Sequence, residues 1–332
     1  MILHSNFSEI DPIQWSALVA KSSTASFFQT PECYGFYASL SFLKPFVYAI
    51  SENEKLMGIA CGYVISDGNI IKRFFSRRAI IPGGLLLDND ISTETLQILL
   101  NHIQQELIQQ SIYIEIRNYN DYSALLTSFE LTGFTYQLHL NFHVATPNVD
   151  IAFKQLSSSK RRQIKQTINA GATVKVAESA EEIKQFYDLL KYLYRNKVKS
   201  PLFPIRFFEN LNALKNGKIF VVKFKEKVIG GIACILLEKK VVYEWFVCGD
   251  DGIEKKLYAS VLATWAGIEY AAKNGYDRFD FMGAGKPDAS YGVRDFKSKF
   301  GGELVEHGRF MYICKPRLYS LGKYIVQKLK KQ

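Results

Sequence analysis

One stretch late in the chain concentrates residue types that are suited to chemistry. Residues 291–303, YGVRDFKSKFGGE, combine aromatic rings, basic side chains and a Gly-Gly pair. Two interpretations follow from these residues alone. The stretch is either a helix end followed by a turn, or it holds a lysine whose positive charge serves a reaction. The surrounding sequence has to decide between them.

A second basic stretch, SSSKRRQIKQTINAG at 157–171, has a clearer pattern. Ser157 or Ser158 can cap a helix over this stretch. Lys160 and Arg161 then lie in its first turn, where cations oppose the helix dipole. Cations at this place favour a bound anion, because the helix N-terminus itself attracts one. A solvated basic face is the alternative.

Several other chemistries are disfavoured by spacing. His139 and His143 would lie about 13 Å apart on one face of a strand, too far apart to share a metal ion. No two of the five cysteines have C-x-x-C spacing, and no G-x-S-x-G is present. The stretch MGAGKPD at 282–288 lacks the Walker pattern. We therefore expect no metal site, no disulfide framework and no covalent nucleophile.

The bulk properties describe a globular protein with an anionic partner or a highly soluble surface. A length of 332 residues exceeds what one hydrophobic core usually supports, so two domains are expected. Hydrophobic residues make up 48% and charged residues 22%. The net charge of +10 favours phosphates, nucleic acid or an acidic membrane surface. The N-terminal residues do not resemble a secretory signal, and no apolar run approaches membrane-spanning length, which predicts a cytoplasmic protein.

Hydrophobic periodicity predicts alternating strands and helices along the whole chain. Short polar turns, Gly and Pro separate the elements. The expected strands are 44–50, 55–65, 111–117, 138–144, 218–224, 227–237, 240–247 and 276–283. The expected helices are 93–110, 157–171, one that Ser179 and Glu182 cap, 204–217, 255–273 and a basic amphipathic helix at 316–332.

Two pairs of similar segments indicate an internal duplication. EKLMGIAC at 54–61 resembles EKVIGGIAC at 226–234, and each is the second strand of a hairpin. IQQSIYIEIR at 108–117 resembles AKNGYDRFDF at 272–281, each running from a helix end into a strand. Together they predict two copies of one α/β unit.

The fold class expected from this order is α/β (α+β), with two tandem domains. Each domain should have a mixed, mostly antiparallel sheet flanked by helices. The polar stretch ATPNVD is the best linker candidate, which places the domains at 1–147 and 148–332. The basic tail should either pack on the second domain or touch an anionic bilayer.

Taken together, these pieces resemble the Fem transferases of the FemAB/FemX type. The resemblance extends over almost the whole chain. Its motifs are FFQTPECYGFY at 27–37, IPGGLLLD at 81–88, the stretch 157–171 and the stretch from 291 onward, where Phe-Lys-x-x-Phe-Gly is the most specific. It implies two GNAT-like domains related by duplication. It also implies transfer of an amino acid from aminoacyl-tRNA to the stem peptide of a peptidoglycan precursor.

The resemblance assigns roles to individual residues. Lys297 matches the family's catalytic lysine, whose charge would stabilise the oxyanion that forms when an amine attacks the aminoacyl ester. Asp88 resembles the acidic residue that could accept the proton of this amine. Arg206 matches a position used on the precursor's diphosphate. Phe296 and Tyr291 are implied at the substrate. No covalent intermediate is expected, and no cofactor beyond the tRNA co-substrate.

The implied partners are the acceptor end of tRNA and a nucleotide- or lipid-linked peptidoglycan precursor. The basic tail adds peripheral contact with the inner membrane surface as a further expectation. One alternative is a GNAT-like N-acyltransferase that uses acyl-CoA or an acyl-carrier protein in envelope or polysaccharide synthesis. The segment GDDGIEKKLY at 249–258 does not fit a GNAT pyrophosphate loop, which disfavours acyl-CoA. Another is a non-catalytic protein that binds precursor or RNA.

Overall fold

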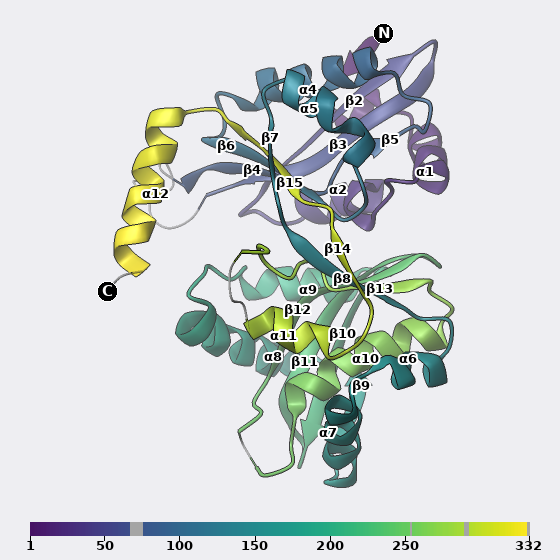
Figure 1. Ribbon diagram of the computed structural model, residues 1–332, viewed down its shortest axis with the longest axis vertical. Coiled ribbons are helices and arrows are strands. Elements are labelled where there is room, and N and C mark those ends of the chain that lie inside the picture. Colours follow the sequence, from purple (N-terminus) through teal and green to yellow (C-terminus); the bar gives the residue numbers. More distant parts are fainter. Residues whose placement is uncertain (67–75, 253, 289–291, 331–332) are drawn as a thin grey trace. The chain divides into compact units, whose positions relative to one another are not determined.

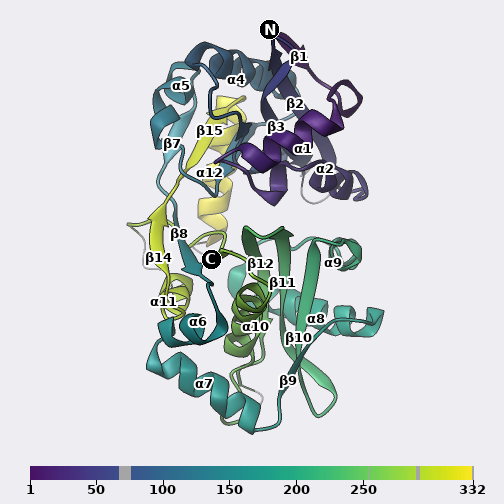
Figure 2. The ribbon, with the colours of Figure 1, turned by 90° about the vertical axis from the view of Figure 1, so that its right-hand side faces the viewer.

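The computed structural model describes residues 1–66, 76–252, 254–288 and 292–330 (Figure 1, Figure 2). The chain divides into two compact units. The first unit contains residues 1–138 together with 307–332, and the second contains residues 139–306. Each unit is a mixed, mostly antiparallel sheet with helices on both faces, which confirms the expected fold class.

The sheet of the first unit runs in the order β1-β2-β3-β4-β6-β15-β7, with β5 paired to β3. Its pairs are antiparallel except that β4 and β6 run parallel. The helix between them, α4, packs its apolar side on β2 and β3, whereas α1 and α2 cover the opposite face. The strands are β1 (Ile2–His4), β2 (Lys44–Glu52), β3 (Lys55–Ile65), β4 (Arg78–Gly83), β5 (Leu86–Leu87), β6 (Tyr113–Asn118), β7 (Thr135–Gln137) and β15 (Arg309–Ile313). The helices are α1 (Pro12–Lys21), α2 (Pro31–Ala38), α4 (Thr93–Leu107), α5 (Leu126–Leu131) and α12 (Pro316–Lys330).

The sheet of the second unit runs in the order β9-β10-β11-β12-β13-β8-β14. Here β12 and β13 are the parallel pair. The long helix between them, α10, packs on one face with α6 and α7, and α8 and α9 pack on the other (Figure 2). The strands are β8 (Leu140–Ala145), β9 (Thr173–Val176), β10 (Gly217–Phe224), β11 (Lys227–Leu237), β12 (Val241–Gly249), β13 (Arg278–Asp280) and β14 (Glu303–Glu306). The helices are α6 (Val149–Gln155), α7 (Ser158–Asn169), α8 (Ala180–Leu193), α9 (Ile205–Ala213), α10 (Ala259–Lys273) and α11 (Gly292–Ser298).

The two sheets have the same strand order, and each borrows one strand from the other half of the chain. In the first unit, β15 lies between β6 and β7. In the second unit, β8 lies between β13 and β14. The last strand of each half therefore completes the sheet of the other half. The units consequently differ from the expected domains 1–147 and 148–332, because an alternating apolar pattern does not specify which sheet a strand joins.

The C-terminal helix α12 differs from its expected place on the second domain. It follows β15 and belongs to the first unit. Its Tyr319 ring packs on Tyr113 of β6 with 5.7 Å between the ring centroids. The Tyr319 hydroxyl also contacts the Met311 sulfur of β15 at 3.4 Å. No helix among the described residues has both the length and the apolar character that a membrane span requires.

Two element boundaries differ from the sequence prediction for local reasons. Helix α9 ends at Ala213 rather than at Gly217, and Gly217 instead opens strand β10. Glycine is required there because a Cβ atom at this position would lie 1.8 Å from the Leu211 carbonyl oxygen. Strand β13 covers only Arg278–Asp280 of the expected 276–283. The rest of that segment forms a loop that contributes to the candidate site.

Candidate active site

Two parallel strands separate in the middle of the second unit. β12 and β13 pair only as far as Tyr243 and Asp280, while β12 continues to Gly249. The chain leaves β13 through Met282, whose φ of 56° bends the backbone away. Trp245 is the extra residue of a bulge in β12 just beyond this point. Within the described ranges, no strand pairs with this edge of β12 beyond Tyr243.

Lys297 of α11 brings its ammonium group to the place where the strands separate. Its Nζ donates hydrogen bonds to the carbonyl oxygens of Phe281 at 2.8 Å and Gly283 at 3.0 Å. It also forms an ion pair with Glu244 Oε1 of β12 at 3.2 Å. The side chain is 11% exposed. An ammonium group has three donors, so each has an acceptor here, and the cation is fixed at one point.

Glu244 is the buried counter-charge of Lys297. Burial raises the pKa of Glu244, the Lys297 ammonium opposes this rise, and the Asp280 carboxylate adds to it. The other carboxylate oxygen, Oε2, is enclosed and has no hydrogen-bond partner among the described residues. Lys297 and Glu244 therefore place a cation and a carboxylate at the point where β12 and β13 separate, and one oxygen of that carboxylate accepts no hydrogen bond from the described residues.

A second cation of α11 holds the adjoining loop. Arg294 donates from Nε to the Ala284 carbonyl at 2.9 Å and from Nη1 to the Pro287 carbonyl at 3.3 Å. Its Nη2 donates to the Lys286 carbonyl. Arg294 and Lys297 together bind five carbonyl groups of the loop 281–287. This explains how a helix of seven residues is positioned.

Sequence reasoning missed both Glu244 and Arg294, although each left a signal. Arg294 precedes Lys297 by three residues, which places both cations on one face of a helix. Glu244 is the single acidic residue inside the apolar run 240–247. A carboxylate in a buried strand predicts a cation beside it, because an unpaired buried charge is costly. Which cation this is becomes known only from the folded structure.

The structure brings together two of the predicted site residues, Lys160 and Phe296. The Lys160 ammonium lies 4.0 Å from the centre of the Phe296 ring and 5.2 Å from that of Phe300. Burial lowers the pKa of Lys160 to about 8, while the more distant Asp251 carboxylate opposes this shift. Phe296 precedes Lys297 on α11, so this contact joins the start of α7 to the helix that carries Lys297. Tyr291 lies outside the described residues.

The other two predicted binding cations have different surroundings. Arg161 donates to the Lys154 carbonyl at 2.9 Å and to the Leu156 carbonyl, and so binds the end of α6. Arg206 lies in the first turn of α9 with a mostly exposed side chain, 3.5 Å from Glu209. The structure thus gives Arg161 a structural contact and leaves Arg206 accessible to an anion.

Asp88 belongs to the first unit, where it follows β5. Its carboxylate forms a 2.8 Å ion pair with Lys55 and accepts a hydrogen bond from the Asp90 N–H at 3.0 Å. Burial raises the pKa of Asp88, but these two hydrogen bonds outweigh burial and leave the pKa below its usual value. All of its contacts lie within the first unit, whereas those of Lys297 lie within the second.

The N-terminus of α10 is occupied by a carboxylate of the chain itself. Asp251 Oδ1 accepts a hydrogen bond from the Ser260 N–H at 2.8 Å, and Oδ2 accepts one from the Ser260 hydroxyl. A helix N-terminus after a strand and a short loop is a common phosphate site. Here the carboxylate takes the N–H group that a phosphate would use and repels a second anion.

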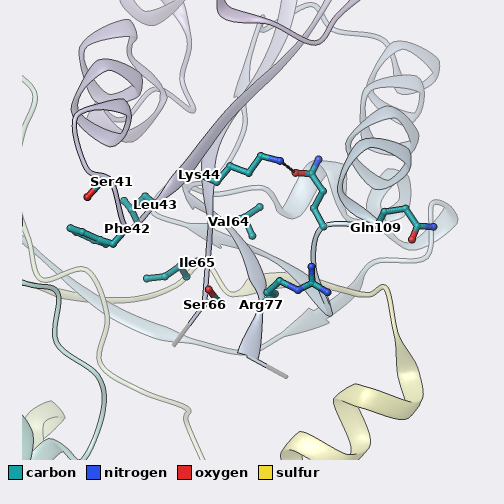
Figure 3. Close-up of a pocket in the computed structure, with 10 residues that line it drawn as sticks. Ser41, Phe42, Leu43, Lys44, Val64, Ile65, Ser66, Arg77 and Gln109 are labelled. Atoms are coloured by element: carbon teal, nitrogen blue, oxygen red, sulfur yellow. Dashed lines mark hydrogen bonds between the residues drawn. The ribbon is translucent and has the colours of Figure 1, made fainter. Parts of the chain in front are cut away.

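The first unit contains a separate open pocket (Figure 3). It has a volume of about 430 Å³ and a mainly polar lining that includes Lys44 and Arg77. Lys44 donates a hydrogen bond to Gln110 at 2.6 Å across it. None of the predicted site residues lines this pocket. Among the described residues that line it are two cations and no carboxylate or imidazole.

Comparisons with known proteins describe what the fold of this chain resembles. Residues 158–298, which include Lys160, Glu244 and Lys297, match the model of the acetyltransferase (GNAT) domain family. A solved structure described as FemX superposes with a TM-score of 0.71 at 15% identity, covering 96% of this chain and 99% of that chain. The chain has the tandem GNAT fold of the FemX type. A search of the curated proteins finds no match.

Other proteins share the tandem GNAT fold over nearly their whole length. One is the C-terminal domain of a putative lysylphosphatidylglycerol synthetase from Agrobacterium fabrum, with a TM-score of 0.59 at 12% identity, covering 95% of this chain and 96% of that chain. Another is a tandem GNAT protein from the clavulanic acid biosynthesis pathway, with a TM-score of 0.59 at 8% identity, covering 94% and 99%. These neighbours share the tandem GNAT fold with this chain.

Proposed function

We propose that this tandem GNAT chain is an aminoacyltransferase. It moves an amino acid from aminoacyl-tRNA to the amine of a peptidoglycan-precursor stem peptide in the cytoplasm. The observation that carries the proposal is the Lys297 ammonium, which is buried and fixed where β12 and β13 separate. A fixed cation in a water-poor site can stabilise the oxyanion that forms during acyl transfer to an amine.

The reaction starts when the acceptor amine attacks the ester carbonyl carbon of the aminoacyl-tRNA. A carbon–nitrogen bond forms and the carbonyl oxygen becomes an oxyanion. The oxyanion then collapses to a carbonyl as the ester carbon–oxygen bond breaks. The terminal ribose oxygen of the tRNA leaves and, as a hydroxyl, takes up the proton that the amine loses. Lys297 can stabilise the oxyanion if its ammonium gives up the hydrogen bond to the partly exposed Gly283 carbonyl and donates to the oxyanion instead. A hydrogen bond to a charged acceptor is the stronger of the two. Glu244 holds the ammonium in place during this exchange.

The proton of the attacking amine needs an acceptor. The resemblance to Fem proteins proposes Asp88 for this role. Its ion pair with Lys55 and its lowered pKa make it a weak acceptor until that pair opens. Replacing Asp88 should therefore change the transfer rate less than replacing Lys297.

The donor is proposed to be tRNA rather than acyl-CoA, because Asp251 occupies the N-terminus of α10. A diphosphate at that point would meet a carboxylate 2.8 Å from the Ser260 nitrogen. The basic charge of the chain instead suits a phosphate backbone. An acyl-carrier protein stays the alternative donor.

The acceptor is proposed to bind near Arg206, whose exposed guanidinium suits a diphosphate. A nucleotide-linked and a lipid-linked precursor both contain this group. The fold is shared with a putative lysylphosphatidylglycerol synthetase, so phosphatidylglycerol is the control acceptor in the assay.

The decisive experiment measures transfer of radiolabel from a mixed pool of aminoacyl-tRNAs to soluble precursor nucleotides, to lipid-linked precursor and to phosphatidylglycerol. Wild type is compared with Asp88→Asn, with Lys297→Met, and with Lys297→Met/Glu244→Gln. The double variant is the matched control, because Lys297→Met alone leaves the buried Glu244 carboxylate without its cation.

Label transferred to a precursor by wild type, and lost in both Lys297 variants, would support the proposal. Transfer of label to phosphatidylglycerol alone would mean that the acceptor is this lipid and not a peptidoglycan precursor. No transfer by folded wild type would move the proposal to acyl-carrier donors. Binding of RNA or precursor without any turnover would identify a binding protein.

A further inference from the structure

Lys160 is a buried cation without a counter-charge in contact. It is 6% exposed and lies against the ring faces of Phe296 and Phe300. In the part of the chain that the structure describes, its Nζ has neither a hydrogen-bond acceptor nor an ion-pair partner. The contact with aromatic faces replaces only part of the lost hydration of an ammonium group.

The charged groups near Lys160 do not supply the missing anion. Asp251 and Lys299 act on it from a distance and with opposite signs. The Asp251 carboxylate already accepts two hydrogen bonds from Ser260. Arg161, the next residue of α7, donates hydrogen bonds from its guanidinium to the Lys154 and Leu156 carbonyl groups at the end of α6. Lys160 is therefore the cation that this end of α7 presents.

The same place is the N-terminus of a helix of twelve residues. The Ser157 hydroxyl accepts a hydrogen bond from the Lys160 N–H at 3.3 Å, and the Ser159 hydroxyl lies 3.0 Å from the Ser157 hydroxyl. The first N–H groups of the helix after the cap point out of its end and have no partner inside the helix. The helix dipole adds partial positive charge at this end. Lys160 is the third residue of this helix, so its ammonium and the helix N-terminus both favour an anion at the start of α7.

We propose that Lys160 and the N-terminus of α7 form a binding site for a phosphate group. A phosphate offers several acceptor oxygens, which suits the combination of helix N–H groups, serine hydroxyls and one ammonium. The site adjoins Phe296, the neighbour of Lys297 on α11. If the proposed transferase function holds, the bound phosphate belongs to the molecule that delivers the acyl group.

The first test uses inorganic phosphate and needs no activity. The lysines are methylated with ¹³C-formaldehyde, and the Lys160 signal is identified by its loss in Lys160→Met. Titration with phosphate at constant ionic strength should raise the pKa of Lys160 by about one unit or more, because a nearby anion favours the charged amine. The Lys165 signal, from a lysine on the same helix beside Phe153, should not respond.

The second test measures thermal unfolding of wild type, Lys160→Met and the matched control Lys165→Met. Methionine keeps the apolar contact with Phe296 and removes the charge. We expect Lys160→Met to raise Tm in phosphate-free buffer and to abolish the stabilisation by phosphate. If Lys160 serves only to pack against Phe296, Lys160→Met should instead lower Tm, and phosphate should stabilise neither protein. Equal phosphate stabilisation of wild type and Lys160→Met would also overturn the proposal.

A third measurement separates the sources of the phosphate group. A short RNA hairpin with a tRNA acceptor end and 4′-phosphopantetheine are titrated against wild type and Lys160→Met. Loss of RNA affinity in the variant assigns the site to tRNA, and loss of phosphopantetheine affinity assigns it to a carrier. If the protein binds phosphate through Lys160 but has no transferase activity, the phosphate site is supported and the proposed function is wrong.

Discussion

Arg309 donates a hydrogen bond to Glu115 Oε1 over 2.6 Å, although the two residues are 194 positions apart in the sequence. The bond joins the borrowed strand β15 to β6. Its counterpart in the second unit joins His143 of the borrowed strand β8 to Asp280 of β13 at 3.0 Å. In both units a buried carboxylate therefore meets a basic side chain from the strand that the other half supplies.

The first prediction concerns the stability of this ion cluster. Glu115 also accepts hydrogen bonds from Arg117, so two guanidinium groups share one carboxylate. Glu115→Gln should lower the free energy of unfolding by about 3 kcal/mol, because it leaves two partly buried cations without their anion. Arg309→Met should cost only about 1–2 kcal/mol, because Glu115 keeps Arg117. Urea unfolding measures both, and equal costs would contradict this account.

The second prediction concerns the exchanged strands. A fragment of residues 139–306 contains every strand of the second sheet and should fold alone. A fragment of residues 148–332 lacks β8, which exposes the β13 edge, and should not fold. Circular dichroism and amide NMR dispersion of the two fragments provide the comparison. Independent folding of 148–332 to the same extent would mean that the exchange does not hold the unit together.

The third prediction gives the pH dependence of the same cluster. Burial raises the pKa of Glu115, but the two arginines outweigh it and lower the pKa to about 2 from an ordinary value of 4.5. A lowered folded-state pKa gives stability that is complete above pH 4.5 and is lost as the pH falls towards 2. The stability difference between wild type and Glu115→Gln should therefore shrink over this range. A constant difference from pH 6 to pH 2.5 would refute it.

The fourth prediction separates the chemistry of Lys297 from its effect on folding. Lys297→Met alone should cost about 3–5 kcal/mol, since the buried Glu244 carboxylate loses its cation. Lys297→Met/Glu244→Gln should recover part of this loss. Both variants should lose about 10²-fold or more in kcat with little change in KM. A double variant that is stable and fully active would remove Lys297 from the reaction.

The fifth prediction concerns the acceptor. Arg206 is exposed and makes only a long contact with Glu209, so Arg206→Ala should leave Tm nearly unchanged. It should raise KM for a diphosphate-bearing acceptor and affect kcat little, because the guanidinium binds a part of the substrate that does not react. Steady-state kinetics with varied acceptor provide the measurement. An unchanged KM would place the diphosphate elsewhere.

The sequence by itself determined the local elements of this protein. The hairpin β2–β3 and the run β10–β11–β12 follow from alternating apolar residues and short polar turns. The start of α7 follows from the Ser157 cap, and the start of α8 follows from the Ser179 cap, because a cap acts within three residues. The duplication was visible because the two halves kept similar segments. These signals lie within short segments, so they can be recognised without knowledge of the fold.

The tertiary structure alone decided which sheet β8 and β15 join and what surrounds the candidate site. Lys297 is held by two backbone carbonyls, and a carbonyl group has no signature in a sequence. Glu244 became part of the site only through its contact with the distant Lys297, and Lys160, which the sequence predicted, gained its aromatic surroundings in the same way. Their burial then set their charge properties, because desolvation depends on everything packed around a group and not on its neighbours in the chain.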